Sequence, residues 1–104
     1  FMLNGPNGPV GNFSLIQIAE MQLDYVLQLL DKLRRGECQA ISASANATVA
    51  FDTALIAAAK KSIWATGCKS WYLDRNGVPA IWPWTFTRFA EEMAAPKFEA
   101  YDMV

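Results

Sequence analysis

The sequence predicts an α+β fold: a strand end and a loop rich in glycine and proline, two long helices, a β-hairpin and a short C-terminal helix. Three observations support this fold class. An amphipathic stretch follows Ser14, an alanine-rich stretch follows Ser44, and an Asn-Gly pair ending at Gly77 separates two short extended segments. The 104 residues are enough for one domain at most.

The opening residues read Phe-Met-Leu-Asn, an apolar stretch typical of the end of a strand. From Asn4 to Ser14 the chain holds three glycines and two prolines, which interrupt both strands and helices. A glycine-rich loop that leads into a helix presents unpaired N–H groups and the positive end of the helix dipole. The loop therefore suits an anionic or electron-rich ligand, with a plain turn as the alternative.

The first helix is predicted over Leu15–Arg35 because its start signals are unusually complete. Ser14 is a favourable N-cap, and Gln17 stands at the matching position of a capping box. Phe13 and Ile18 occupy the two positions of a hydrophobic staple, which fixes the angle at which the chain enters a helix. These signals together predict a well-defined helix N-terminus directly after the glycine-rich loop.

The same helix has a polar and an apolar face, and Gly36 suits its C-terminal end. The solvated stripe is formed by Gln17, Glu20, Asp24, Gln28, Asp31 and Arg35. The opposite face is predicted to be buried and is formed by Ile16, Ala19, Leu23, Val26, Leu27, Leu30 and Leu33. Burial of more than half of the circumference is indicated by further apolar residues at Leu15, Ile18, Met21 and Leu29.

A connector over Glu37–Ala43, with a short extended piece at Gln39–Ser42, leads to a second helix. Ser44 is its predicted N-cap, the helix is expected over Ala45–Ala65, and Gly67 is expected to end it. Many alanines make this helix slim, so that it can pack closely. The residues expected to face inward are Val49, Leu55, Ile56 and Ile63.

A β-hairpin is predicted next, with Ser70–Leu73 and Pro79–Trp82 as its strands. The turn between them, Asp74–Gly77, contains Asn-Gly, the strongest short signal for a hairpin. Thr85 is then expected to cap a short third helix that runs to about Met93. The remaining residues show no clear period, so no element is predicted for them.

Composition excludes several classes of function. The net charge of −1 gives no electrostatic reason to expect a nucleic-acid or anionic-membrane partner. Histidine is absent, which excludes Ser-His or Cys-His catalysis and histidine-ligated metal sites within the chain, and we predict no catalytic and no metal-binding residues. Cys38 and Cys68 form no metal motif, so we expect reduced, packed cysteines in a cytoplasmic protein, with a disulfide as the alternative. No apolar run is long enough to span a membrane.

Two motifs carry a resemblance to a known family. The first is Gly67-Cys-Lys-Ser-Trp-Tyr-Leu-Asp-Arg-Asn-Gly77, followed by Ile81-Trp-Pro-Trp84. It resembles the C-terminal region of class B flavoprotein monooxygenases, the Baeyer–Villiger and flavin-containing monooxygenase group, in its hydroxyacetophenone- or cyclohexanone-monooxygenase-like version. The second is the Gly-Pro-Asn loop with the helix capped by Ser14 and its Glu20-Met-Gln22 turn. It fits the last part of the FAD-binding domain of the same family.

The resemblance implies that the chain is a fragment. Family members are Rossmann-like flavoproteins with two dinucleotide-binding domains, and their two Gly-x-Gly-x-x-Gly fingerprints are absent here. Residues 1–36 would supply the last strand, loop and helix of the FAD-binding domain, and residues 37–104 the C-terminal helix, hairpin and tail. The implied parent uses FAD, NADPH and O2 to insert one oxygen atom into a ketone or heteroatom substrate. The fragment alone is expected to be inactive and to need the remainder of the parent enzyme.

The resemblance also implies cofactor-binding residues in two segments. The FAD side would be formed by Asn4, Gly5, Pro6, Asn7, Gly11, Asn12, Ser14 and Leu15. The NADP side would be formed by Lys69, Ser70 and Trp71. The alternative for Trp71 is a core aromatic residue under the hairpin. Packing rather than ligand binding is expected for Tyr72, Trp82, Trp84 and Phe86.

Two other readings stay open at this point. The chain could be a free-standing helical module that binds a partner protein through exposed aromatic side chains. It could also be part of another flavoprotein oxidoreductase with two dinucleotide-binding domains. The segment Gly67–Trp84 argues against the second reading, because such enzymes lack the Cys-x-Ser-Trp-Tyr hairpin.

Overall fold

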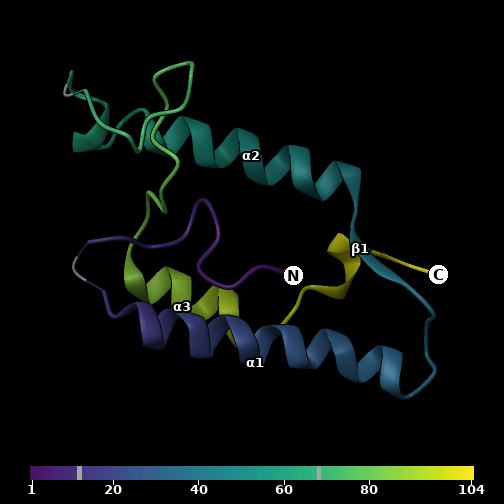
Figure 1. The fold of residues 1–104 in the computed structure, drawn as a ribbon. Helices are drawn as coiled ribbons and strands as arrows, with labels where there is room; N and C mark the ends of the chain where they lie inside the picture. The colour runs from purple at the N-terminus through teal and green to yellow at the C-terminus, as the bar shows by residue number, and fades with distance from the viewer. Residues whose placement is uncertain (12, 68) are drawn as a thin grey trace.

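The computed structural model describes residues 1–11, 13–67 and 69–104 and has an α+β architecture (Figure 1). The main elements are three α-helices and a two-stranded antiparallel sheet, joined by two short 3₁₀-helices. In chain order they are α1 (Leu15–Arg34), β1 (Ile41–Ala43), α2 (Ala45–Ala59), η1 (Ile63–Ala65), α3 (Phe86–Ala94), η2 (Phe98–Ala100) and β2 (Tyr101–Met103). No described helix is both long and apolar enough to cross a membrane.

Helix α1 begins and ends almost where the sequence predicts. The Ser14 hydroxyl accepts the Gln17 N–H at 3.3 Å, so the N-cap is confirmed. The reciprocal side-chain bond of a full capping box is not found among the described residues. Arg35 caps the C-terminus, and Gly36 follows with a φ of 73°, the left-handed conformation that glycine adopts without strain.

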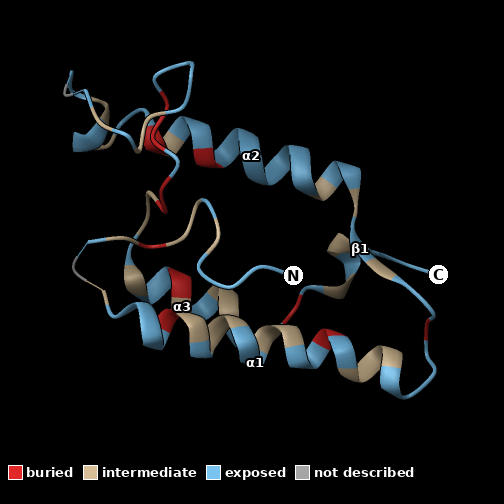
Figure 2. Cartoon of the chain, viewed as in Figure 1, coloured by how far each residue is buried: buried red, intermediate tan, exposed pale blue. Residues whose placement is uncertain are grey.

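The core lies between α1 and α3, and the segment before α3 contributes aromatic side chains to it. Ile18, Trp82 and Phe89 form its buried centre. The half-buried side chains packed around them are Phe13, Met21, Trp84, Phe86 and Met93. The predicted staple is therefore in place, with Phe13 against the cluster that contains Ile18. Figure 2 shows buried positions on both helices where α1 and α3 lie together.

The opposite side of α1 corrects the sequence prediction. Ile16, Leu23, Leu27 and Leu30, expected in the buried face, are exposed, whereas Ile18 and Leu29 are buried. The periodicity predicted one buried apolar face, but the side that this chain covers, with α3 and the aromatic segment before it, is the one that carries the further apolar residues such as Ile18. Ala19, Val26 and Leu33 are half-buried at the boundary between the two faces.

Helix α2 ends earlier than predicted, at Ala59 rather than Ala65. The Ser62 N–H and hydroxyl both donate to the Ala59 carbonyl, and this shift to i−3 bonding ends the α-helix. The 3₁₀-helix η1 follows. Of the residues expected to face inward only Leu55 is buried, and the exposed ones are Val49, Ile56 and Ile63. Figure 1 shows that α2 runs apart from α1 and α3.

The predicted hairpin is present as a turn with a single bridge. Leu73 and Pro79 form an isolated antiparallel bridge, and the Asp74 N–H donates to the Val78 carbonyl at 2.9 Å. Gly77 takes the positive φ, 72°, that the Asn-Gly signal requires. The two predicted strands do not extend further. The N–H groups of Tyr72 and Leu73 donate to Ser70 within their own segment, and Pro79 has no N–H to donate across. The turn is confirmed, and the strand lengths are wrong.

The third helix and the extended connector are confirmed. Thr85 caps α3 by accepting the Arg88 N–H at 3.2 Å. The extended piece expected near residues 39–42 is β1, and its partner is β2 in the tail, for which the sequence predicted no element. Ile41 lies opposite Met103 in this ribbon.

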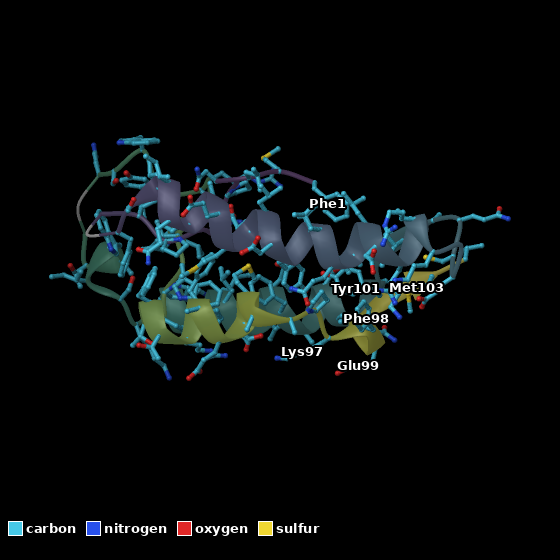
Figure 3. The ribbon with its side chains drawn as sticks, turned by 90° about the horizontal axis from the view of Figure 1, so that it is seen from below. Phe1, Lys97, Phe98, Glu99, Tyr101 and Met103 are labelled. Atoms are coloured by element: carbon cyan, nitrogen blue, oxygen red, sulfur yellow. The ribbon has the colours of Figure 1, made fainter. Side chains whose placement is uncertain are left out.

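Side-chain contacts also join the tail to α1. The hydroxyls of Tyr25 and Tyr101 lie 2.7 Å apart, and burial together with this bond raises the pKa of Tyr25. The Lys32 ammonium lies 4.9 Å from the centre of the Phe98 ring. Figure 3 shows Phe98 and Tyr101 on the side of the tail that faces α1, whereas Lys97 and Glu99 point away.

The opening residues do not form the expected strand end. Residues 1–3 are irregular and exposed, and within the described parts of the chain no strand lies beside them. The loop that follows instead runs along the segment before α3. The Asn7 N–H donates to the Ala80 carbonyl at 3.3 Å, and the Trp82 N–H donates to the Gly8 carbonyl at 3.0 Å. These two bonds hold the glycine-rich loop in place.

Candidate functional site

Two hydrogen bonds of Asn4 join the glycine-rich loop to the first turns of α1. The Asn4 backbone N–H donates to the Gln22 side-chain oxygen at 2.7 Å, and its side-chain amide donates to the Leu15 carbonyl at 3.3 Å. Asn4 and Asn7 have φ values of 51° and 66°, a left-handed conformation that asparagine tolerates better than most residues. The structure therefore brings Asn4, Asn7 and Leu15 together. The sequence did not predict that the Gln22 side chain accepts a hydrogen bond from Asn4; it indicated Gln22 only as part of the Glu20-Met-Gln22 motif.

The glycines of the loop differ in the space that surrounding atoms leave for a side chain. At Gly5 a side chain would meet the Met2 sulfur, because a Cβ there would lie 3.0 Å from it. At Gly11 φ is 94° and no atom would lie within 4 Å of a Cβ, so conformation requires this glycine and open space surrounds it. Pro6 is exposed between them. Asn12, the other predicted site residue of the loop, lies outside the described residues.

The N-terminus of α1 is open to solvent. Ser14 provides the cap for the Gln17 N–H, and its carbonyl accepts the N–H of Ile18 at 3.0 Å. For the amides of Leu15 and Ile16 no partner lies among the described residues, as is usual for the first N–H groups of a helix. Both of these side chains are exposed. The site can therefore offer N–H donors and the positive helix end to an electron-rich group.

The second predicted segment is an exposed aromatic surface. Trp71 is 85% exposed and stacks on Tyr72 with ring centres 4.2 Å apart. Trp64 also contacts Tyr72, edge-on, with ring centres 5.4 Å apart. The reading of Trp71 as a core residue is therefore wrong, because one face of its indole is free.

Lys69 and Ser70 flank this surface. Lys69 is exposed, and the Ser70 hydroxyl accepts the Tyr72 N–H at 3.2 Å, which shapes the turn before the bridge. Cys68, which belongs to the same motif, lies outside the described residues. Among the described residues no hydrogen bond joins Lys69, Ser70 or Trp71 directly to the glycine-rich loop.

Backbone bonds through Ala80 connect the two segments. Its carbonyl accepts from Asn7 of the loop, and its N–H donates to the Tyr72 carbonyl at 2.8 Å. The backbone hydrogen bonds of Ala80 therefore connect the glycine-rich loop with the segment that contains the exposed Trp71. The role of Ala80 could not be predicted from the sequence, because a backbone hydrogen bond does not depend on residue type.

The aromatic residues before α3 pack, as predicted. Phe13 stacks on Phe86 with ring centres 5.1 Å apart, and Trp82 meets Trp84 edge-on at 4.8 Å. The Arg88 guanidinium lies over the Trp84 ring at 4.1 Å, a cation–π contact that the sequence did not suggest. These contacts account for the half-buried position of Trp84.

Ser14→Ala is expected to lower the free energy of unfolding by about 1 kcal/mol, because the Gln17 N–H loses its acceptor. Chemical denaturation of the two proteins would measure the difference. Ser14→Asp restores an N-cap and is expected to retain the stability of the original protein. Equal stability of the alanine variant and the original protein would show that this cap contributes nothing.

No family model matches the chain, and no solved structure matches it. Curated monooxygenases do. An uncharacterized monooxygenase of Mycobacterium tuberculosis (strain H37Rv) is 39% identical over 103 residues, which are 99% of this chain and 21% of the relative. A Baeyer–Villiger monooxygenase of Pseudomonas aeruginosa is 31% identical over 94% of this chain and 20% of its own length. A probable FAD-binding monooxygenase of Aspergillus luteorubrus is 30% identical over 95% of this chain and 21% of its own length.

Along nearly its whole length, then, the chain is related to monooxygenases. More particularly, its relatives include Baeyer–Villiger and FAD-binding monooxygenases, which confirms the resemblance seen in the two motifs. The chain spans about a fifth of the length of the curated relatives it matches.

Proposed function

We propose that the chain is the C-terminal portion of an FAD- and NADPH-dependent monooxygenase that inserts one oxygen atom from O2 into a ketone or heteroatom substrate. The observation that carries the proposal is the similarity along the chain to about a fifth of several monooxygenases. In this proposal residues 1–36 complete an FAD-binding domain, and residues 37–104 form a C-terminal segment beside it. The buried free thiol of Cys38 fits a cytoplasmic protein.

The N-terminus of α1 fits the electron-rich edge of FAD. When bound, FAD supplies the redox and oxygen chemistry of the reaction. The backbone N–H groups of Leu15 and Ile16 would donate to the flavin edge, and the helix dipole would stabilise negative charge there by roughly 0.3–2 kcal/mol. The open space at Gly11 would let the loop pass close to the ring. The loop residues proposed to line the cofactor are Asn4, Gly5, Pro6, Asn7, Gly11, Ser14 and Leu15, together with Asn12.

The exposed indole of Trp71 fits the nicotinamide side of NADPH. Its free face offers a flat apolar surface, and its N–H is a single donor that suits a ribose hydroxyl. Stacking on Tyr72 holds the ring in one orientation and so lowers the entropy lost on binding. Lys69 and Ser70 would lie beside the same nucleotide, Lys69 as an exposed cation.

The isolated chain is expected to bind neither FAD nor NADPH with micromolar affinity. Both diphosphate-binding fingerprints are absent, so the residues present would contact only the ring edges of either cofactor. Titration calorimetry of the purified 104-residue chain with each cofactor would measure this. Micromolar binding of FAD would contradict the proposal that this segment completes a larger flavin site.

The function itself is tested on the full-length protein encoded with this segment. We expect it to purify with bound flavin, to consume NADPH in the presence of a ketone or sulfide, and to yield a product heavier by one oxygen atom. Mass spectrometry with ¹⁸O2 identifies the source of that atom. A full-length protein that holds no flavin would refute the proposal.

A second candidate is a free-standing module that binds a partner protein. The exposed apolar side chains of α1 and α2 favour it, because such surfaces in monomers mark interaction sites. The reading frame in the source DNA decides between the two functions. A continuous upstream frame with Gly-x-Gly-x-x-Gly excludes the free-standing module, and a stop codon followed by a start codon would favour it.

A further inference from the structure

One face of α1 carries an exposed apolar stripe. The stripe is defined by Ile16, Leu23, Leu27 and Leu30, which are 74%, 43%, 51% and 39% exposed. Their spacing of seven, four and three residues places them on one side of a helix. Ile18, which belongs to the core cluster, and Leu29, which is also buried, lie on the opposite side. The helix therefore has the sequence of an element covered on both sides, and this chain covers one of them.

The whole chain exposes more surface than a self-sufficient domain. Its accessible surface is 7270 Å², whereas a folded monomer of this mass exposes about 5,800 Å². Its radius of gyration is 15.1 Å, against about 13 Å for a compact domain of this length. The excess of about 1,500 Å² is larger than the area that one partner buries in a standard protein interface, about 800 Å². There is therefore surface enough for a permanent interface.

A groove marks the C-terminal half of the stripe. It has a volume of about 570 Å³, and Leu27, Leu30 and Phe98 supply its apolar lining. Charged residues at the C-terminal end of α1, among them Arg34 and Arg35, line the rest of it. The groove thus offers both apolar and charged contacts, and protein interfaces combine the two.

We propose that the stripe on α1 is the docking surface for the preceding part of the same polypeptide, the region that corresponds to the rest of the monooxygenase relatives. This inference rests on the proposed function. The relatives are about five times longer than the segment matched here, so four fifths of their length is available to cover the stripe. A second copy of the chain is the competing occupant, and the experiment below separates the two.

The docking has a consequence for the candidate flavin site. Ile16 begins the stripe and also contributes one of the open N–H groups at the helix N-terminus. The inner face of α1 is fixed by Ile18 against Trp82 and Phe89. Contact along the outer face then fixes the direction in which the helix N-terminus points within the full-length enzyme.

The test is cysteine labelling of the full-length, flavin-loaded protein. Leu27→Cys places a thiol in the middle of the stripe, and Asp24→Cys places one on the neighbouring polar face as a matched control. Each variant is treated with a maleimide, and site-specific labelling is followed by peptide mass spectrometry. We expect Leu27→Cys to react about tenfold or more slowly than Asp24→Cys, with equal rates for both in denaturant.

The outcomes are distinct. Equal rates in the folded protein would overturn the proposal, because the stripe would then be in water. Slow labelling of Leu27→Cys that becomes fast on dilution would also overturn it, in favour of a second copy. Slow labelling at every protein concentration supports it. A full-length protein without flavin that still protects Leu27→Cys would refute the proposed function and leave the docking surface standing.

Discussion

In the full-length enzyme, Trp71→Ala is expected to raise the KM for NADPH by about tenfold, because it removes an aromatic surface whose stacking contributes about 1.4 kcal/mol. Its indole is exposed and lies on a preformed stack with Tyr72, so nothing in the core depends on it. Flavin content is expected to stay unchanged. Steady-state kinetics with varied NADPH, together with the flavin absorbance of the purified variant, would measure both quantities.

Trp64→Ala is the matched control for this experiment. Trp64 belongs to the same aromatic group and contacts Tyr72 edge-on, but it stands outside the Ser-Trp motif. It is expected to leave the KM for NADPH near that of the original enzyme. Loss of flavin from the Trp71 variant with an unchanged KM for NADPH would show that the assignment of Trp71 is wrong.

Gly11→Ala is expected to deprive the full-length enzyme of most of its flavin. Gly11 has a φ of 94°, so any side chain there is strained by roughly 1–2 kcal/mol. The open space around it is proposed to be filled by the cofactor, and a methyl group would enter that space. Flavin occupancy and melting temperature, measured on the same preparation, separate the loss of cofactor from the loss of stability.

Gly36→Ala provides the same strain far from the loop. Gly36 also has a positive φ, 73°, and a Cβ there also meets no atom within 4 Å. The two variants are therefore expected to lose similar stability, while only Gly11→Ala loses flavin. If both variants retain flavin equally well, the glycine-rich loop is a plain turn.

Local signals predicted where each α-helix begins. The caps Ser14, Ser44 and Thr85 all accept the backbone N–H that their position requires, because capping depends on a few neighbouring residues. Burial was predicted less well. Periodicity shows that a face is apolar, but it does not show whether this chain or another part of the protein covers it, so Leu23 and Leu27 were placed in the core and are exposed.

The sequence did not predict the long-range pairing of β1 with β2. Strand β2 has only three residues and no alternation that marks a strand, and it exists because β1 lies beside it. For the candidate site, the motifs proposed Asn4, Ser14 and Trp71. The structure shows that Asn4 is hydrogen-bonded to α1, that Ser14 caps α1 and that Trp71 is exposed. The bond from Asn4 to Gln22 depends on the path of the loop over α1, which composition does not encode.

The pairing of β1 with β2 joins two segments that lie far apart in the sequence. Val104 exchanges backbone hydrogen bonds with Ala40, so the connector between α1 and α2 is held by the final residues of this segment. Closing so long a loop is a slow, entropically costly step that depends on non-local contacts. Removal of residues 101–104 is therefore expected to release this connector and to make it sensitive to proteases, which limited proteolysis would measure.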